Sequence, residues 1–323
     1  MKQPLSDPDT YAEHAVDVLD AAVARIKANR PFALITSVGI QGGAAREEGT
    51  LALADLDGPM TGYLSNGCID RDIQLRAVAA IEAGRKEIVR YGEGSRFVDL
   101  KLPCGGALDV LLDPDPDRAM ILAAQEQLSA RRAADLVFSG PKTTTHECDQ
   151  FGFRYAPRIR LCLAGRGAIF RSMAVIGQAS GFDVALMSPD AEDLAAVGHL
   201  SVLAPVHMTG PNHVGALDML DQHSAFLTLF HDHDWEPYLL KHALEQPVGF
   251  VGALGSRRTQ MMRLETLRQI GVPDPDIARL RGPIGLVGSL RDASMIAVSA
   301  LAEIVQTFPS QIEKTTCSAP PLT

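Results

Sequence analysis

The sequence predicts an α/β protein that joins a C-terminal Rossmann-like domain, built on a doubly wound parallel sheet, to a smaller N-terminal α+β domain. Three observations predict this class. From residue 158 onward, apolar strands alternate with amphipathic helices, as in parallel sheets covered on both faces. Before residue 116, the strands follow one another with few helices between them. The 323 residues are 46% hydrophobic, which is enough for two ordinary cores.

The N-terminal domain is expected over residues 1–115. Apolar residues recur with helical spacing over 11–28 and 69–83. Short apolar runs predict the strands, at 31–38, 51–54, 61–64, 87–90, 96–102 and 107–112.

A linker is expected next, over 116–157, as a helix at 117–132 followed by an extended, turn-rich connection. The Rossmann-like domain then occupies 158–310, and the polar tail 311–323 is expected to be disordered. The strands of the Rossmann-like domain are predicted at 158–164, 182–187, 199–203, 225–230 and 248–251. Its helices are predicted at 169–179, 235–244, 256–270 and 292–307.

Composition excludes several classes of partner. The formal net charge is −9 and the isoelectric point is about 5.5, so we expect neither nucleic acid nor an anionic membrane as a partner. No apolar run reaches the roughly 20 residues that a membrane-spanning helix needs, and the N-terminus lacks the apolar core of a signal peptide. The five cysteines show no zinc-type spacing. We therefore expect a cytoplasmic protein with reduced thiols.

One glycine turn has the position of a phosphate-binding turn. Gly165-Arg166-Gly167 follows a strand and opens a helix, where backbone amides and the helix dipole favour an anion. Phe170 stands where the dinucleotide fingerprint has a third glycine, which lets helix and strand pack closely. Asp190 matches the expected ribose-binding acid only loosely. Two interpretations stay open: a phosphate site at Gly165 and Gly167, or a turn that only packs.

The segment His231-Asp232-His233 ends the strand 225–230, at the sheet edge where ligands of open α/β folds gather. Its side chains can bind a metal, relay protons or bind a polar ligand. The alternative is a polar loop that caps the following helix.

A second turn, Gly252–Arg258, also lies between a strand and a helix. Gly255 precedes Ser256, which can cap the helix, and the free amides there favour an anion. Arg257 and Arg258 add forked donors that suit phosphate. The alternative is a solvated helix face.

Two cysteines lie beside glycine turns. Cys68 comes just before the second predicted helix, where a helix N-terminus favours the thiolate. Cys104 is followed by Gly105 and Gly106 in a bend between strands. The alternative for a lone cysteine is a small buried hydrophobic residue, an interpretation that fits Cys162.

With these motifs placed, the chain resembles the XdhC/CoxI family, the accessory proteins of xanthine dehydrogenase and related molybdenum hydroxylases, over roughly residues 12–305. Several motifs occur in the family's order: Pro103–Gly106, His231–His233, Gly252–Arg258 with Leu264, Pro283–Leu286, Ile296–Ser299 and Ala302–Ile304.

The chain also departs from the family's pattern, which indicates a divergent member. The first loop keeps Arg46 but lacks the family's serine and proline. Asn66-Gly67-Cys68-Ile69-Asp70 replaces Gly-Gly-Cys-Val-Glu. The turn at 165–170 lacks the usual histidine and last glycine, and 287–290 replaces Asp-Ile-Gly-Ala.

The resemblance implies a carrier rather than an enzyme. Its cargo would be the molybdenum cofactor, either molybdopterin or its cytosine dinucleotide. The protein would protect the cofactor, support its sulfuration by a cysteine desulfurase and deliver it to an apo molybdenum hydroxylase of the xanthine dehydrogenase type. Which target enzyme is served stays open, as does the oligomeric state, for which a homodimer is one candidate.

The residues expected to bind the cofactor come from both domains. They are Arg46, Cys68, Cys104, Gly105, Gly106, Gly165, Gly167, His231, Asp232, His233, Gly255, Ser256, Arg257 and Arg258. Cys104 is the best candidate to approach molybdenum, and no catalytic residue is assigned. Two alternatives remain: a nicotinamide-dependent oxidoreductase with His231 or His233 as acid and base, and a regulatory nucleotide-binding protein.

Overall fold

The computed structural model describes residues 12–57, 59–95, 102, 105–141, 150–230 and 234–315. The chain divides into two compact units. Unit 1 comprises Met1–Pro157 and Ser310–Thr323, and unit 2 comprises Arg158–Pro309. Unit 2 is therefore inserted between two segments of unit 1.

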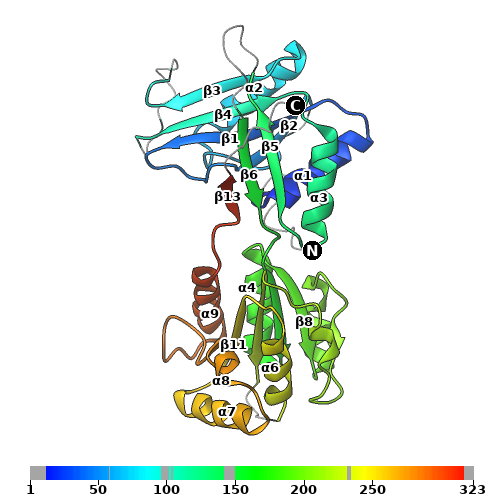
Figure 1. Cartoon of the computed structure of the whole chain (residues 1–323), viewed down its shortest axis with the longest axis vertical. Coiled ribbons are helices and arrows are strands. Elements are labelled where there is room, and N and C mark those ends of the chain that lie inside the picture. Colours follow the sequence, from blue (N-terminus) through cyan, green and yellow to red (C-terminus); the bar gives the residue numbers. More distant parts are fainter. Residues whose placement is uncertain are drawn as a thin grey trace, which may run out of the picture. The chain divides into compact units, whose positions relative to one another are not determined.

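Unit 1 contains a four-stranded antiparallel sheet in the order β2-β1-β4-β3. Its strands are β1 (Phe32–Gln41), β2 (Leu51–Asp55), β3 (Glu87–Gly92) and β4 (Ala107–Asp113). Both faces of this sheet are buried, so β1 and β2 are apolar nearly throughout. One face packs on α1 (Ala15–Lys27) and α3 (Arg118–Ser129), and the other packs on α2 (Asp70–Ala83). Figure 1 shows α1 and α3 side by side.

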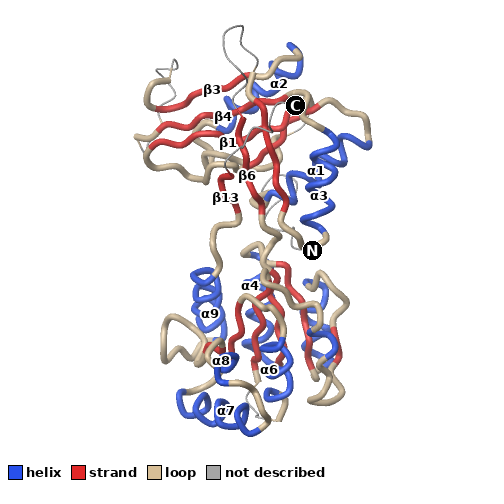
Figure 2. The backbone as a smooth tube through the Cα atoms, in the orientation of Figure 1, coloured by secondary structure: helices blue, strands red, loops and turns tan. Residues whose placement is uncertain are grey.

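A second sheet in unit 1 consists of β13 (Ile312–Thr315), β6 (Gln150–Tyr155) and β5 (Ala134–Ser139), in that order and antiparallel. It packs into the same core as α1 and α3. Figure 2 shows the strands of this sheet next to one another.

This second sheet differs from the expected linker over 116–157 and from the expected disordered tail. In β5 the side chains of Ala134, Leu136 and Phe138 are buried alternately with exposed neighbours, which is the period of a half-buried strand. In β13, Ile312 is the only strongly apolar residue. Its pairing with β6 through backbone hydrogen bonds leaves no such pattern in the sequence.

Unit 2 is a six-stranded parallel sheet in the order β12-β11-β10-β7-β8-β9. The strands are β7 (Arg160–Gly165), β8 (Asp183–Ser188), β9 (Val206–His207), β10 (Ser224–Leu229), β11 (Phe250–Ala253) and β12 (Leu280–Arg281). Strand order reverses between β7 and β10, which is the switch point of a doubly wound Rossmann sheet. The predicted fold class is confirmed.

Helices cover both faces of the sheet in unit 2. One face packs on α4 (Gly167–Ala179), α5 (Ala191–Val197) and α9 (Ala293–Thr307). The other packs on α6 (Glu236–Glu245), α7 (Arg257–Gln269) and α8 (Asp274–Ile277). The strand expected at 199–203 is instead a 3₁₀ turn (Gly198–Leu200), with β9 after it. Among the described helices, none combines the length and apolar character needed to cross a membrane.

Candidate functional site

The β7–α4 turn lies at the switch point of unit 2, as the sequence predicts. Gly165 is packed against the end of β10, because a Cβ atom there would lie 2.6 Å from the Cβ of Leu229. Gly167 has a φ of +83°, and a Cβ atom on it would meet no atom within 4 Å. Gly165 therefore allows β7 and β10 to pack closely at their ends, and Gly167 leaves open space at the start of α4.

The amides of this turn already donate within the protein. The Arg166 amide donates to the carbonyl of Leu229 at 3.4 Å, and the Gly167 amide donates to Oδ2 of Asp193 at 2.6 Å. The other oxygen of Asp193 accepts from Nε of Arg171, on α4. No sequence signal indicates this role for Asp193, because its partners lie more than 20 residues away and α5 is not among the predicted helices.

Two further features separate this turn from a dinucleotide site. Phe170, in place of the third glycine, is fully buried in the core between α4 and the sheet. Asp190, the loose match to a ribose-binding acid, caps α5 by accepting the amides of Glu192 and Asp193 at 2.8 and 3.2 Å. Its carboxylate is thus already used for local structure.

The turn before α7 is more open. Ser256 caps the helix, accepting the Thr259 amide at 3.1 Å, as its sequence position predicts. Gly255, Ser256, Arg257 and Arg258 are all exposed. The first turn of α7 thus offers a positive helix end with two guanidinium groups beside it.

A buried ion pair lies beneath this turn. Arg263 on α7 donates to both oxygens of Glu236 on α6 at 2.9–3.1 Å, and both side chains are 2% exposed. Thr228 on β10 donates to the same carboxylate at 3.0 Å. Arg263 also donates to the Leu254 carbonyl at 2.6 Å. The pair therefore fixes the start of α7 relative to the ends of β10 and β11.

A third loop reaches the same edge of the sheet. The Ile284 amide donates to the carbonyl of Ala253, the last residue of β11, at 3.2 Å. α9 holds this loop, because Glu303 accepts the Gly285 amide at 2.6 Å and Ser299 accepts the Val287 amide at 2.8 Å. The sequence marked this loop only as a family motif.

The segment His231-Asp232-His233 lies outside the described residues. Its neighbours are placed: Phe230 is buried and stacks on Trp235, with ring centroids 6.0 Å apart. Among the residues that are described, no group of three or more His, Cys, Asp or Glu side chains is arranged to hold a metal.

In unit 1, three glycine segments meet at one edge of the sheet. Ala107, the first residue of β4, pairs with the last residues of both β1 and β3. A Cβ atom on Gly106 would lie 2.5 Å from the Gln41 carbonyl oxygen and 2.6 Å from that of Gly43. Gly105 has a φ of +69° with open space around its Cα. Cys104 itself lies outside the described residues.

Cys68 is exposed, in the turn before α2. The carboxylate of Asp70 organises that turn, accepting the Leu64, Ser65 and Gly67 amides at 2.8, 3.1 and 2.6 Å. The thiol is therefore presented on a fixed loop.

The start of α2 is tied to the glycine edge of unit 1. Tyr91 on β3 is fully buried and donates to Asp72, in the first turn of α2, at 2.8 Å. Burial, and then the hydrogen bond to Asp72, raise the pKa of Tyr91 well above its usual range. Tyr91 precedes the end of β3 by one residue, so this hydrogen bond joins the first turn of α2 to that end of β3.

Arg46 lies in the loop between β1 and β2 and is already engaged. It donates to the Glu13 carbonyl at 2.5 Å, and its guanidinium lies over the ring of Tyr63, 4.8 Å from the centroid. Tyr63 donates in turn to the Glu13 carboxylate. Burial and this hydrogen bond raise the pKa of Tyr63. Arg46 thus holds the loop as well as being a candidate cofactor ligand.

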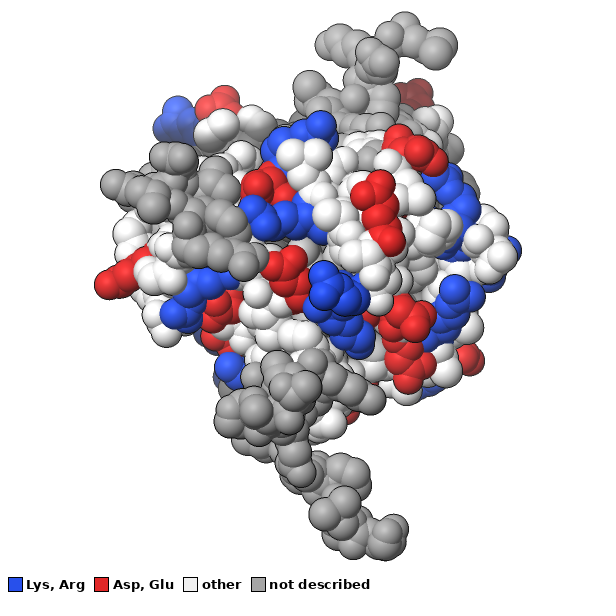
Figure 3. All heavy atoms as spheres, turned by 90° about the horizontal axis from the view of Figure 1, so that it is seen from above, with Lys and Arg blue, Asp and Glu red and all other residues white. Residues whose placement is uncertain are grey.

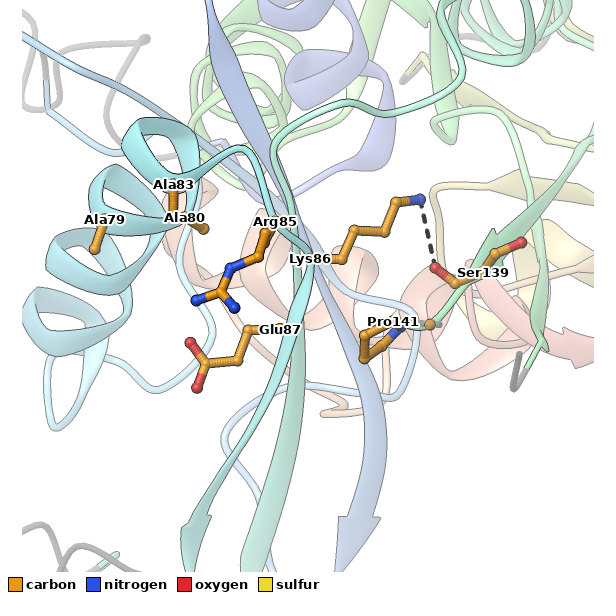
Figure 4. Close-up of a pocket in the computed structure, with 9 residues that line it drawn as sticks. Ala79, Ala80, Ala83, Arg85, Lys86, Glu87, Ser139 and Pro141 are labelled. Atoms are coloured by element: carbon orange, nitrogen blue, oxygen red, sulfur yellow. Dashed lines mark hydrogen bonds between the residues drawn. The ribbon is translucent and has the colours of Figure 1, made fainter. Parts of the chain in front are cut away.

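Unit 1 also has a hollow, which lies away from the loops described above. It measures about 750 Å³ and is bounded by α2, the start of β3 and the residues after β5. In Figure 4, Lys86 points toward Ser139, whose carbonyl it reaches at 3.5 Å. Among the described residues that are expected to bind the cofactor, none lines this hollow. In unit 2, a hollow of about 600 Å³ follows β9, within the loop 209–216.

Charge is mixed over the face drawn in Figure 3, where lysine and arginine side chains alternate with aspartate and glutamate. Oppositely charged side chains of unit 1 also form ion pairs, such as Arg90–Asp109 and Arg154–Asp135, at 2.8 Å in each pair. That face carries no broad basic patch among the described residues, in keeping with the net charge of −9.

Comparison with known proteins gives matches in both units. A model of the XdhC Rossmann domain matches residues 161–304, and a model of the XdhC and CoxI family matches residues 25–92. The chain is 29% identical to the molybdenum cofactor insertion chaperone PaoD of Escherichia coli (strain K12) over 340 residues, covering 99% of each protein. It is 24% identical to the uncharacterized protein YqeB of the same organism, covering 86% of this chain and 44% of YqeB.

A solved structure has the same fold. It comes from Bacillus halodurans, is named as a xanthine dehydrogenase and superposes with a TM-score of 0.74. The superposition covers 91% of this chain and 95% of the other, at 19% identity. At that identity the similarity supports the fold alone.

Proposed function

The chain belongs to the XdhC and CoxI family, and we propose that it binds the molybdenum cofactor and delivers it to an apo molybdenum hydroxylase of the xanthine dehydrogenase type. One observation carries the proposal: the chain is similar over its whole length to a molybdenum cofactor insertion chaperone. The proposed setting is the cytoplasm, where thiols stay reduced.

The turn before α7 is the proposed site for the phosphate end of the cofactor. Its helix N-terminus is exposed and carries Arg257 and Arg258, and the buried Glu236–Arg263 pair holds it in place. The β7–α4 turn is the weaker candidate, because the amides of Arg166 and Gly167 already donate to protein oxygens.

Thiols are the proposed contacts for the molybdenum and dithiolene end, because soft ligands suit that group. Cys68 is exposed on the turn that Asp70 organises, and Cys104 immediately precedes the open Gly105. We assign Cys104 the closer approach to molybdenum. Sulfuration of the bound cofactor by a cysteine desulfurase would precede its delivery.

A carrier must release its cargo, so the protein itself carries out no turnover in this proposal. The nicotinamide oxidoreductase alternative fits the turn at Gly167 poorly. Phe170 fills the core there, Asp190 caps a helix and Asp193 takes the turn amide.

The first test is the molybdenum and pterin content of the protein, purified without oxygen from a host that makes the cofactor. Near-stoichiometric pterin is the expected result. A variant with Arg257→Ala and Arg258→Ala should bind pterin at least about 100-fold more weakly and lose most of it on purification, since hydrogen bonds to charged groups contribute about 1.5–3 kcal/mol each. Arg268→Ala, at the exposed far end of the same helix, is the matched control and should retain it.

Wild-type protein without pterin would contradict the carrier proposal, above all if a free nucleotide raised its melting temperature. The thiols are tested separately with Cys104→Ala and Cys68→Ala. Cys104→Ala should lower cofactor retention or activation of an apo hydroxylase without changing the circular dichroism spectrum. Unchanged retention and activation would remove Cys104 from the site.

A further inference from the structure

Asp193 is a buried carboxylate that the proposed function does not use. Its side chain, on α5, is 1% exposed, and it accepts the Gly167 amide at 2.6 Å and the Nε of Arg171. The hydrogen bond to Asp193 raises the pKa of Arg171. Asp193 thus puts a negative charge of the protein itself where the start of α4 would otherwise attract an anion.

The surroundings of this carboxylate are also acidic. Asp190 and Glu192 both precede it in the chain, by three residues and by one, and both act electrostatically on Arg171. A diphosphate at this turn would have two unfavourable choices. It would either sit beside several like charges, or take the Gly167 amide from Asp193 and remove one of the hydrogen bonds of a buried carboxylate.

We propose that Asp193 prevents free dinucleotides from binding at the β7–α4 turn and thereby determines which phosphate ligands unit 2 excludes. Binding sites often gain specificity from a repulsive element as well as from attractive contacts. Here the fold is that of a dinucleotide-binding sheet, and Gly167 still leaves open space at the helix start. A carrier whose Rossmann turn accepted abundant nucleotides would be occupied by them, and Asp193 prevents this.

This inference rests on unit 2 alone and is independent of the identity of the cargo. Its test uses the full chain with NADH, followed by fluorescence, and inorganic pyrophosphate, followed by calorimetry. Asp193→Ala removes the carboxylate and frees Arg171. Asp193→Asn keeps its shape and removes only the charge. Glu245→Gln, which neutralises an exposed carboxylate at the end of α6, is the control.

The wild-type chain and Glu245→Gln should bind both probes weakly or not at all. Asp193→Ala should bind them at least about tenfold more tightly, and Asp193→Asn should show a smaller gain in the same direction. A second change, Arg171→Gln, should abolish the gain. These outcomes do not depend on pterin, so they are separate from those of the proposed function.

Two results would overturn the proposal. One is a wild-type chain that binds NADH or pyrophosphate as tightly as the Asp193 variants do. The other is a folded Asp193 variant with a lower melting temperature and no gain in binding, which would mean that the carboxylate only stabilises the start of α4. If Asp193→Ala does not fold, the isosteric Asp193→Asn decides between these results.

Discussion

Gly105 and Gly106 are neighbours in sequence but have different structural roles. Gly106 is enclosed by backbone, with the carbonyl oxygens of Gln41 and Gly43 within 2.6 Å of where a Cβ atom would lie. Gly105 faces open space and needs only its positive φ. A ligand can therefore approach the backbone at Gly105, whereas Gly106 maintains the contact between two loops.

This difference predicts different costs for the same substitution. Gly106→Ala should lower the free energy of unfolding by about 3 kcal/mol, because the enclosing atoms are backbone and cannot rotate away. Gly105→Ala should cost about 1 kcal/mol, the strain of a left-handed conformation. Urea denaturation of both variants measures the two costs. Equal losses would mean that the loop after β1 adjusts to a methyl group.

At the scale of residues, a role could be predicted where the neighbouring residues in the sequence indicate it. Ser256 was expected to cap a helix and does so. Asp193 was missed, because its role depends on Gly167, which is distant in sequence. Phe170 was noticed as a departure from the fingerprint, but only the structure shows that its ring belongs to the core.

At the scale of elements, the Glu236–Arg263 pair joins α6 and α7 beneath the proposed phosphate site. Arg263→Met should lower the free energy of unfolding by about 3–5 kcal/mol, because it leaves a carboxylate buried without its partner. The double variant Arg263→Met with Glu236→Gln should recover most of that loss. Urea denaturation of both variants measures the loss and its recovery.

The control is the exposed pair of Arg268 and Asp274, at the other end of α7. Arg268→Met should cost less than about 1 kcal/mol, as exposed ion pairs usually do. A double variant no more stable than Arg263→Met would show that Arg263 acts through its bond to the Leu254 carbonyl instead.

Elements with a strong period were predictable, and short ones were not. The helices at α4, α6, α7 and α9 were expected within a few residues of their bounds, because each has ten or more residues and follows a recognisable turn or strand end. β12 has two residues and α5 has seven, too few to show a period. The strand β13 was missed because pairing with β6, not an apolar pattern, holds it in place.

At the scale of the whole molecule, the C-terminal segment completes unit 1. Ile312 pairs with Tyr155 and contacts the glycine at position 49, while Lys314 forms an ion pair with Glu48 at 2.6 Å. Truncation after Pro309 should therefore expose the edge of β6 and destabilise unit 1 more than unit 2. Hydrogen exchange should quicken in peptides from β5 and β6 and stay slow in β7 and β10.

Truncation after Thr315 is the control, since it removes only the residues beyond β13, and exchange in β5 and β6 should then be unchanged. If loss of β13 instead quickened exchange equally throughout both units, the two units would unfold as one cooperative block, and the division at residues 157 and 310 would have no energetic meaning.

The insertion of unit 2 between β6 and β13 also determines how the chain bears mechanical load. The Ala156 amide donates to the Gln311 carbonyl at 2.9 Å, so the two connections to unit 2 leave unit 1 side by side. A pull on the two ends of the chain reaches unit 2 only after β13 has separated from β6. Until those strands part, unit 2 lies outside the path of the force and keeps its fold under tension.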